Sequence, residues 1–198
     1  MLRILGKTIQ QELSLVTERL VLRLLKPDEV TEEYVRGLND IEITRYLTNT
    51  KRNPQTFETV KEFVSAHWKS PNQVLFGLFL TENRRLIGTI RLHGISYHDY
   101  FGMIGICLFA KDCWGKGYGL EALNKVTHFA FHDLGLHYIE AGSYEENLVS
   151  LSLFRKAGFS TIANYKNKYR FEDRFASVII LGLVNSGFDE SLLRTDAR

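Results

Sequence analysis

Short apolar runs separated by polar turns dominate the pattern of this chain. Residues 17–25 (TERLVLRLL) alternate between apolar and polar side chains, which predicts a strand with one buried face. Most later runs are almost continuously apolar, which is typical of strands covered on both faces. The predicted strands are 17–25, 74–80, 86–95, 102–110, 137–144, 159–165 and 174–184.

Other segments repeat apolar residues at helical spacing. Pro27 and Asp28 give a helix-start signal, and Gly135 and Gly158 each follow a helical pattern as stop signals. The predicted helices are 26–40, 55–70, 120–134 and 147–158, with a short turn at 41–47. The apolar faces carry Val30, Tyr34, Val35 and Leu38 in the first helix, and Phe57, Val60, Phe63, Val64 and His67 in the second.

The order of these elements, β-αα-βββ-α-β-α-ββ, predicts an α/β domain with a mixed sheet. No repeat or low-complexity linker divides the 198 residues, so we expect one domain over 1–198. Its core would span about 17–184, with 1–16 as an N-terminal arm and 185–198 as a C-terminal tail.

Composition and charge exclude several classes of protein. The chain is 44% apolar and 24% charged, with a net charge of +2, and no run is long enough to span a membrane. Two cysteines, Cys107 and Cys113, form no disulfide or metal-ligand pattern, so we expect a cytoplasmic protein without a structural metal. The basic and aromatic stretch 164–170 could suggest nucleic acid, but a solvated hairpin loop is the favoured interpretation.

The stretch DCWGKGYGLEALNKV, residues 112–126, places three glycines at alternate positions just before a helical pattern. The first N–H groups of a helix have no intrahelical partner, and glycine lets the backbone approach an anion with φ > 0. Gly115, Gly117 and Gly119 therefore fit phosphate binding, and Lys116 adds charge. The spacing is neither a P-loop nor a dinucleotide fingerprint. A glycine-rich turn for tight strand–helix packing remains open at this point.

Two segments together narrow the choice. WGKGYGLEA (114–122) and NLVSLSLFRKAGF (147–159) resemble the GNAT superfamily of N-acetyltransferases. Residues 114–119 match the family's (Q/R)xxGx(G/A) turn, except that Trp114 replaces Gln or Arg. A tryptophan at this position resembles the branch of the family that contains ribosomal-protein N-terminal acetyltransferases and amino-sugar acetyltransferases. The resemblance implies a mixed sheet of about seven strands and about four helices, with two splayed parallel strands.

The resemblance also implies acetyl-CoA as cosubstrate. Its pyrophosphate would lie on the N–H groups of residues 115–120, and its pantetheine arm between the strand ending at 107–109 and the strand around Ser143. The implied cofactor-binding residues are Cys107, Leu108, Phe109, Trp114, Gly115, Lys116, Gly117, Tyr118, Gly119, Leu120, Asn147 and Ser150. Considered alone, Asn147 also fits a helix N-cap, Ser150 a solvated helix residue, and Trp114 a side chain that packs beside the turn.

The sequence indicates the catalytic groups less clearly than the cofactor-binding residues. Acyl transfer to an amine needs a route for the amine proton and a donor for the oxyanion, for which we expect a backbone N–H near Leu108 or Phe109. Phe154 replaces the tyrosine acid common in the family, so Ser150 becomes the substitute candidate, with water as the alternative. Glu145 and His98 are candidate bases, although each also fits a structural or solvated role.

These observations predict direct acetyl transfer to a primary amine. A small-molecule or amino-sugar acceptor, including nucleotide sugars, is favoured, and a peptide N-terminus such as that of a ribosomal protein is the alternative. A covalent route through Cys107 is disfavoured because that residue lies in an apolar strand. A non-catalytic acyl-CoA sensor is the rival outside enzymology. We expect no nucleic-acid or membrane partner, and a monomer or homodimer.

Overall fold

The computed structural model describes residues 2–4, 7–9, 13–47, 50, 53–68 and 70–194. Its strands are β1 (Leu2–Ile4), β2 (Lys7–Ile9), β3 (Ser14–Val16), β4 (Leu20–Leu24), β5 (Val74–Leu80), β6 (Leu86–Ser96), β7 (Phe101–Leu108), β8 (Tyr138–Tyr144), β9 (Ser160–Phe171) and β10 (Arg174–Val184). Its α-helices are α1 (Glu32–Asn39), α2 (Ile41–Thr44), α3 (Phe57–Trp68), α4 (Tyr118–His132) and α5 (Leu148–Lys156). Short 3-10 turns lie at Pro27–Glu29, Lys111–Cys113 and Glu190–Arg194.

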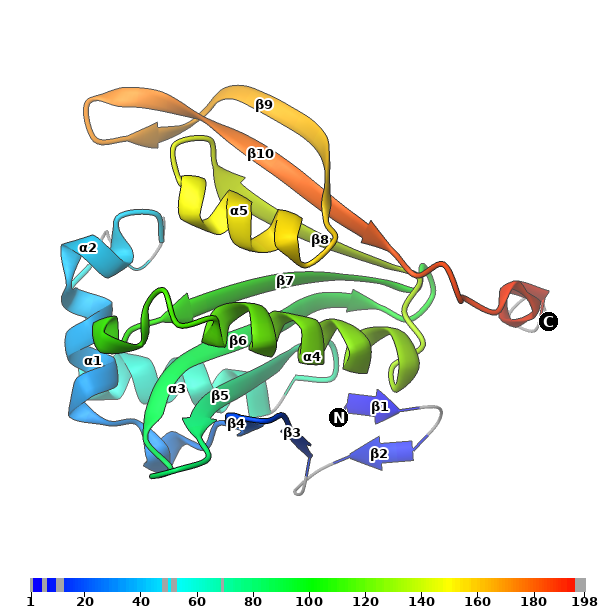
Figure 1. Ribbon diagram of the computed structural model, residues 1–198, viewed down its shortest axis with the longest axis horizontal. Helices are drawn as coiled ribbons and strands as arrows, with labels where there is room; N and C mark the ends of the chain where they lie inside the picture. The colour runs from blue at the N-terminus through cyan, green and yellow to red at the C-terminus, as the bar shows by residue number, and fades with distance from the viewer. Residues whose placement is uncertain are drawn as a thin grey trace.

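The main sheet has eight strands in the order β3-β4-β5-β6-β7-β8-β10-β9, and β1 and β2 pair separately (Figure 1). The α/β class with a mixed sheet is confirmed: among the described residues the main sheet has eight strands and there are five α-helices, where about seven strands and four helices were expected. The additional strand is β3, which comes from the predicted arm. The Thr17 hydroxyl accepts a hydrogen bond from the Leu20 N–H at 3.0 Å and so turns the chain between β3 and β4.

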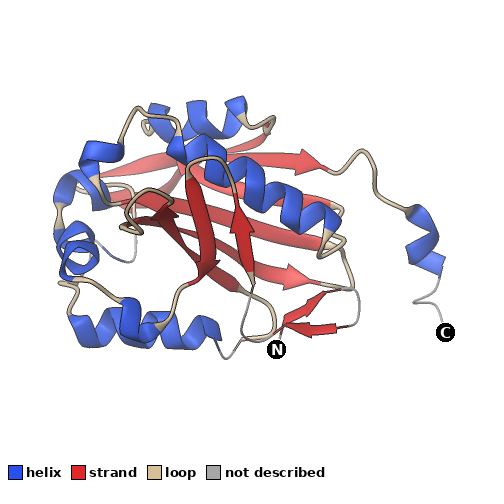
Figure 2. Ribbon diagram, turned by 60° about the horizontal axis from the view of Figure 1, so that its bottom comes forward, coloured by secondary structure: helices blue, strands red, loops and turns tan. Residues whose placement is uncertain are grey.

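Helices cover both faces of the sheet (Figure 2). The α4 and α5 face holds the larger core, which includes Phe76, Ile90, Leu123 and Phe129. The α1 and α3 face holds a second core, which includes Tyr34, Val64 and Phe109. The central strands therefore carry a separate hydrophobic core on each face.

Several predicted boundaries are wrong for local reasons. The 26–40 segment breaks at Val30, which is extended, because the Thr31 hydroxyl caps α1 through the Tyr34 N–H at 3.1 Å. The predicted loop 164–170 belongs to β9, which pairs with β10 up to the turn at Glu172 and Asp173; its side chains are exposed, as expected. Helix α4 begins at Tyr118, two positions before the predicted Leu120. Phe63, expected on the buried face of α3, is 40% exposed.

Candidate active site

The strands β7 and β8 pair only at their beginnings. Their parallel ladder joins Phe101–Met103 to Tyr138–Glu140 and ends there. Beyond that point β7 stays with β6 as far as Leu108, while β8 stays with β10 as far as Tyr144. The two strands therefore diverge in the middle of the sheet, as Figure 1 shows, and in the described chain no ladder joins them beyond Met103 and Glu140. A strand edge without a neighbouring strand can pair with the amides of a ligand. This is the splay that the resemblance to the GNAT superfamily implied.

The glycine turn follows the end of β7, beyond the point where the two strands part. Gly115 has φ 72° and Gly117 has φ 86°, conformations that favour glycine. Gly117 is the N-cap of α4. Gly119 is buried in the first turn of the helix, where an added Cβ would lie 3.5 Å from Leu153 of α5; its part in binding the cofactor stays a prediction.

The backbone N–H groups of residues 115–120 make no hydrogen bond within the described part of the chain, and the first bonded one in α4 is that of Glu121. Residues 115–117 are exposed. A run of unpaired N–H groups at a helix N-terminus forms an anion-binding site without further side chains. The turn therefore presents unpaired N–H donors to solvent, and the binding of a diphosphate there stays a prediction.

Hydrogen bonds from Thr17 and Arg19, in the N-terminal part of the chain, hold this turn and the first turn of α4 in place. The Arg19 guanidinium donates to the Lys116 carbonyl at 2.8 Å and to the Glu121 carboxylate at 2.7 Å. The Thr17 hydroxyl and the Arg19 N–H donate to the same carboxylate at 2.6 and 2.9 Å. Arg19 thus fixes both sides of Gly117 and keeps a cation next to it.

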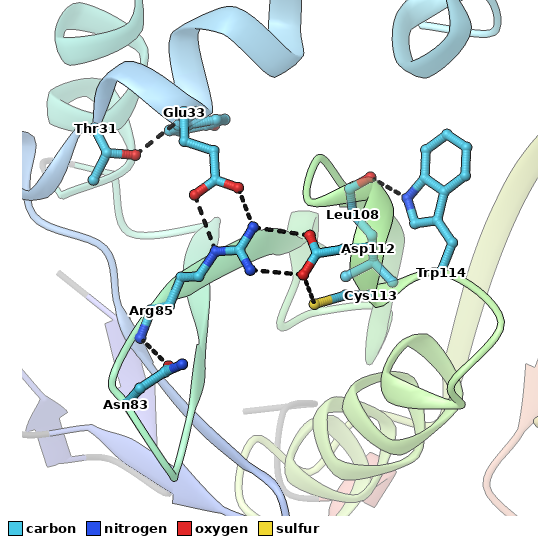
Figure 3. A network of polar contacts seen from close by, with 9 residues as sticks. Thr31, Glu33, Asn83, Arg85, Leu108, Asp112, Cys113 and Trp114 are labelled. Carbon is cyan, nitrogen blue, oxygen red and sulfur yellow. Dashed lines mark hydrogen bonds and ion pairs between the residues drawn. The ribbon is translucent and has the colours of Figure 1, made fainter.

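A second anchor ties the residues before the turn to α1 and α2. The Arg85 guanidinium lies between the carboxylates of Glu33 and Asp112, with N–O distances of 2.7 and 2.8 Å to Asp112 (Figure 3). Hydrogen bonds that Arg85 donates to the Glu33 and Asp112 carboxylates raise its pKa, so the guanidinium stays charged. Lys111 binds Asp40 at 2.6 Å and Glu42 at 2.7 Å. The segment 111–113 is therefore fixed before the glycines begin.

The other predicted cofactor residues lie around the same gap. Asn147 is the N-cap of α5 and accepts from the Ser150 N–H at 3.2 Å, so its capping role is confirmed while its ligand role stays a prediction. Trp114 packs beside the turn and donates from Nε1 to the Leu108 carbonyl at 2.9 Å (Figure 3). The prediction that Phe109 could donate its N–H to the oxyanion is wrong, because that N–H is bonded to the Ile87 carbonyl at 3.1 Å.

The candidate catalytic side chains are not all brought together. Ser150 lies in the first turn of α5, beside the gap. Glu145 binds Asn164 of β9 at 3.1 Å and Lys166 at 3.5 Å, on the outer side of β8. His98 lies in the turn before β7, at the end where the strands are still paired. Phe154, which stands at the family's tyrosine position, is buried against Phe159.

Sequence reasoning missed Glu140, which lies where the two strands part. Its neighbours Ile139 and Ala141 point into the core on the α4 face, so alternation directs Glu140 to the opposite face. Within the described chain its carboxylate forms no hydrogen bond or ion pair. Desolvation and the charge of Glu140 raise the pKa of Tyr138, two positions away. The alternation of side chains in residues 137–144 (HYIEAGSY) indicates that Glu140 points away from Ile139 and Ala141. Only the register of the strands shows which face of the sheet this is.

Further properties of the described residues limit the chemistry that the site can perform. Burial raises the pKa of the Cys107 thiol to about 12, so this sulfur remains protonated at neutral pH. Among the residues that the structure describes, no group of three or more His, Cys, Asp or Glu is placed to hold a metal ion. None of the described helices is both long and apolar enough to cross a membrane.

Comparison with known proteins decides the family. The model of the acetyltransferase (GNAT) domain matches residues 19–160. The chain belongs to the GNAT acetyltransferases. The uncharacterized N-acetyltransferase YoaA of Bacillus subtilis is 29% identical over 147 residues, which is 73% of this chain and 81% of YoaA. The probable N-acetyltransferase YjcK of the same organism is 40% identical over 91 residues, 42% of this chain and 46% of YjcK.

Solved structures show the same fold. A spermidine N-acetyltransferase from Vibrio cholerae, in complex with CoA and spermine, has a TM-score of 0.77 at 21% identity, covering 87% of this chain and 99% of its own. The ribosomal L7/L12 alpha-N-protein acetyltransferase RimL, in complex with coenzyme A, has a TM-score of 0.75 at 15% identity, covering 85% and 96%. GNAT acetyltransferases use acetyl-CoA, and this chain is an acyltransferase of that family; its acceptor is a separate question.

Proposed function

We propose that this GNAT acetyltransferase transfers acetyl from acetyl-CoA directly to the primary amine of a small molecule, with amino sugars and nucleotide sugars as the favoured class. The observation that carries the proposal is the run of unpaired N–H groups at residues 115–120, beside two strands that diverge. A peptide N-terminus is the second candidate, supported by the likeness of the fold to RimL.

In this proposal the main chain does most of the binding. The N–H groups of residues 115–120 hold the diphosphate, and the cations Lys116 and Arg19 add positive potential beside it. The open edges of β7 and β8 pair with the amides of the pantetheine arm. Asn147 and Ser150 lie at the acyl end. Acetyl-CoA, when bound, supplies an activated thioester.

The enzyme's own groups then need only manage protons and charge. A free alkyl ammonium has a pKa near ~10, so the acceptor must lose a proton before it attacks. Glu140 at the fork of the strands is the carboxylate we assign to that task, acting directly or through water, in place of Glu145 and His98. Ser150 remains our candidate for proton delivery to the departing thiolate. The neutral Cys107 thiol carries no acetyl group in this scheme.

The direct test is release of the CoA thiol from acetyl-CoA over a panel of amines that includes amino sugars, nucleotide amino sugars, polyamines and short peptides. We expect turnover of at least one small amine and none without an amine. Turnover confined to peptides would favour the second candidate. Tight acetyl-CoA binding with no turnover on any amine would contradict the catalytic proposal.

A further inference from the structure

On the α1 and α3 face of the sheet, Arg91 of β6 is a half-buried cation without a counter-ion. In the described part of the chain its guanidinium forms no hydrogen bond or salt bridge; the Phe63 ring lies 6.0 Å away. Burial lowers the pKa of Arg91. An unpaired charge at such a position costs stability, and a bound anion would offset that cost.

The backbone next to Arg91 leaves room for a ligand. Arg91 is paired in the sheet with Gly105 of β7, which lies beyond the point where β7 and β8 part. A Cβ built on Gly105 would meet no atom within 4 Å. The missing side chain therefore leaves open space on β7 next to Arg91, beyond the point where β7 and β8 part.

Two histidines complete the cluster. His67 of α3 is only 7% exposed, and its Nδ1 lies 2.7 Å from the Phe63 carbonyl, so Nδ1 carries the proton. Its Nε2 is buried and has no partner in the described chain. Burial, then the charges of Arg91 and His67, lower the pKa of His93 to about 4, so this residue is neutral at pH 7. The cluster offers one cation and one unused acceptor, and no carboxylate.

We propose that Arg91, with His67 beside it, binds an anionic group of the amine acceptor, a carboxylate or a phosphate. This inference rests on the proposed function, because it requires an amine acceptor. It places that acceptor on the face of the sheet opposite α4 and the glycine turn. Arg91 can bind such a group through two parallel N–H bonds, and His67 Nε2 can accept from a neighbouring hydroxyl or amine. A polyamine would instead meet an uncompensated cation, which disfavours that class of acceptor.

Calorimetry with saturating CoA tests the assignment without catalysis. Three matched pairs serve as probes: phosphoethanolamine and ethanolamine, glucosamine 6-phosphate and glucosamine, and 4-aminobutyrate and 4-amino-1-butanol. Spermidine is the polycation. We expect the member that carries a phosphate or carboxylate, in at least one pair, to bind about tenfold to a hundredfold more tightly than the partner that lacks this group, as expected for a hydrogen bond between charged groups. The phosphate and carboxylate pairs identify the anion.

Arg91→Met should abolish that preference. Arg36→Met is the matched control, because Arg36 is exposed on α1 and loses the same charge. Circular dichroism checks that both variants fold. The assignment is overturned if no pair shows a preference, if the preference survives in Arg91→Met, or if spermidine binds more tightly than every anionic amine. Thiol release measured with the same amines separates the two proposals: turnover without anionic preference sinks this inference alone, whereas no turnover of any amine sinks the proposed function.

Discussion

Arg19 and Glu121, 102 residues apart, form a two-point contact in which the Arg19 N–H and Nε bind different oxygens of one carboxylate at 2.9 and 2.7 Å. This contact fastens the turn between β3 and β4 to the first turn of α4. Through the bond from Arg19 to the Lys116 carbonyl, Arg19 also contacts the glycine turn that precedes α4. Arg19 of the N-terminal region thus holds a loop that lies about a hundred residues later in the chain.

Glu121→Gln should lower the free energy of unfolding by about 1 kcal/mol, since Arg19 is partly exposed and solvent screens the pair. Desolvation raises the pKa of Glu121, but hydrogen bonds from Thr17 and Arg19 outweigh it and lower that pKa overall. A depressed folded-state pKa means that the contribution is present above the unfolded value, near ~4.3, and is lost as the pH falls through the folded value. Urea unfolding should therefore show the two proteins converging in acid.

The exposed Glu62 of α3 supplies the control, and Glu62→Gln should leave the free energy of unfolding unchanged. A difference between wild type and Glu121→Gln that stayed constant down to pH ~3 would contradict the assigned role of the carboxylate.

Local sequence signals gave the elements well where apolar runs end at clear polar turns. The predicted strands 74–80 and 174–184 coincide with β5 and β10. The glycine turn could also be recognised, because φ > 0 at Gly115 and Gly117 restricts the residue type.

The rest depends on pairing between distant segments. Glu140 and Glu145 look alike in the sequence, yet register places one at the fork of the strands and lets Asn164 engage the other. Arg91 stands out only once α1 and α3 are known to bring no carboxylate to it. The sequence contains these residues, but the partners that define their roles come from the tertiary fold.

Gly117→Ala should separate backbone strain from ligand binding. With φ 86°, a side chain at this position costs about 1–2 kcal/mol and lies 3.4 Å from the Arg19 guanidinium. Gly135→Ala is a matched control at the other end of α4, with φ 69° and no atom within 4 Å of the added Cβ. Both should lower the melting temperature, but only Gly117→Ala should weaken CoA binding in calorimetry.

Gly117→Asp adds a negative charge at the same place and should abolish acetyl-CoA binding. Undiminished affinity in that variant would refute the placement of the diphosphate on residues 115–120.

Asn147 caps α5, so a test of its role in turnover must separate the loss of this cap from the loss of a ligand contact. Asn147→Ala loses the cap of α5 and should cost about 0.5–2 kcal/mol, whereas Asn147→Ser keeps a capping oxygen. If the amide binds the ligand, both variants should lower the turnover, and Asn147→Ser should do so with little loss of stability. Thr31→Ala removes the equivalent cap of α1 and should affect stability alone. Full turnover in Asn147→Ser would leave Asn147 with the capping role only.

Cys107 should react slowly with iodoacetamide at pH 8 in the folded protein, because its pKa of about 12 leaves almost no thiolate. The same cysteine should react readily after unfolding in guanidinium, which provides the control. Mass spectrometry after mixing with acetyl-CoA should show no acetylated Cys107. A stoichiometric acetyl adduct on this residue would overturn direct transfer.

Glu140→Gln tests the assigned base against its rival. The substitution keeps the shape of the side chain and removes its basicity, so kcat should fall about a hundredfold or more, while the affinity for CoA stays the same. Glu145→Gln tests the alternative: Glu145 already binds Asn164 and Lys166, and we expect its loss to change kcat by less than about threefold. A loss of kcat in Glu145→Gln together with full kcat in Glu140→Gln would return the role to Glu145.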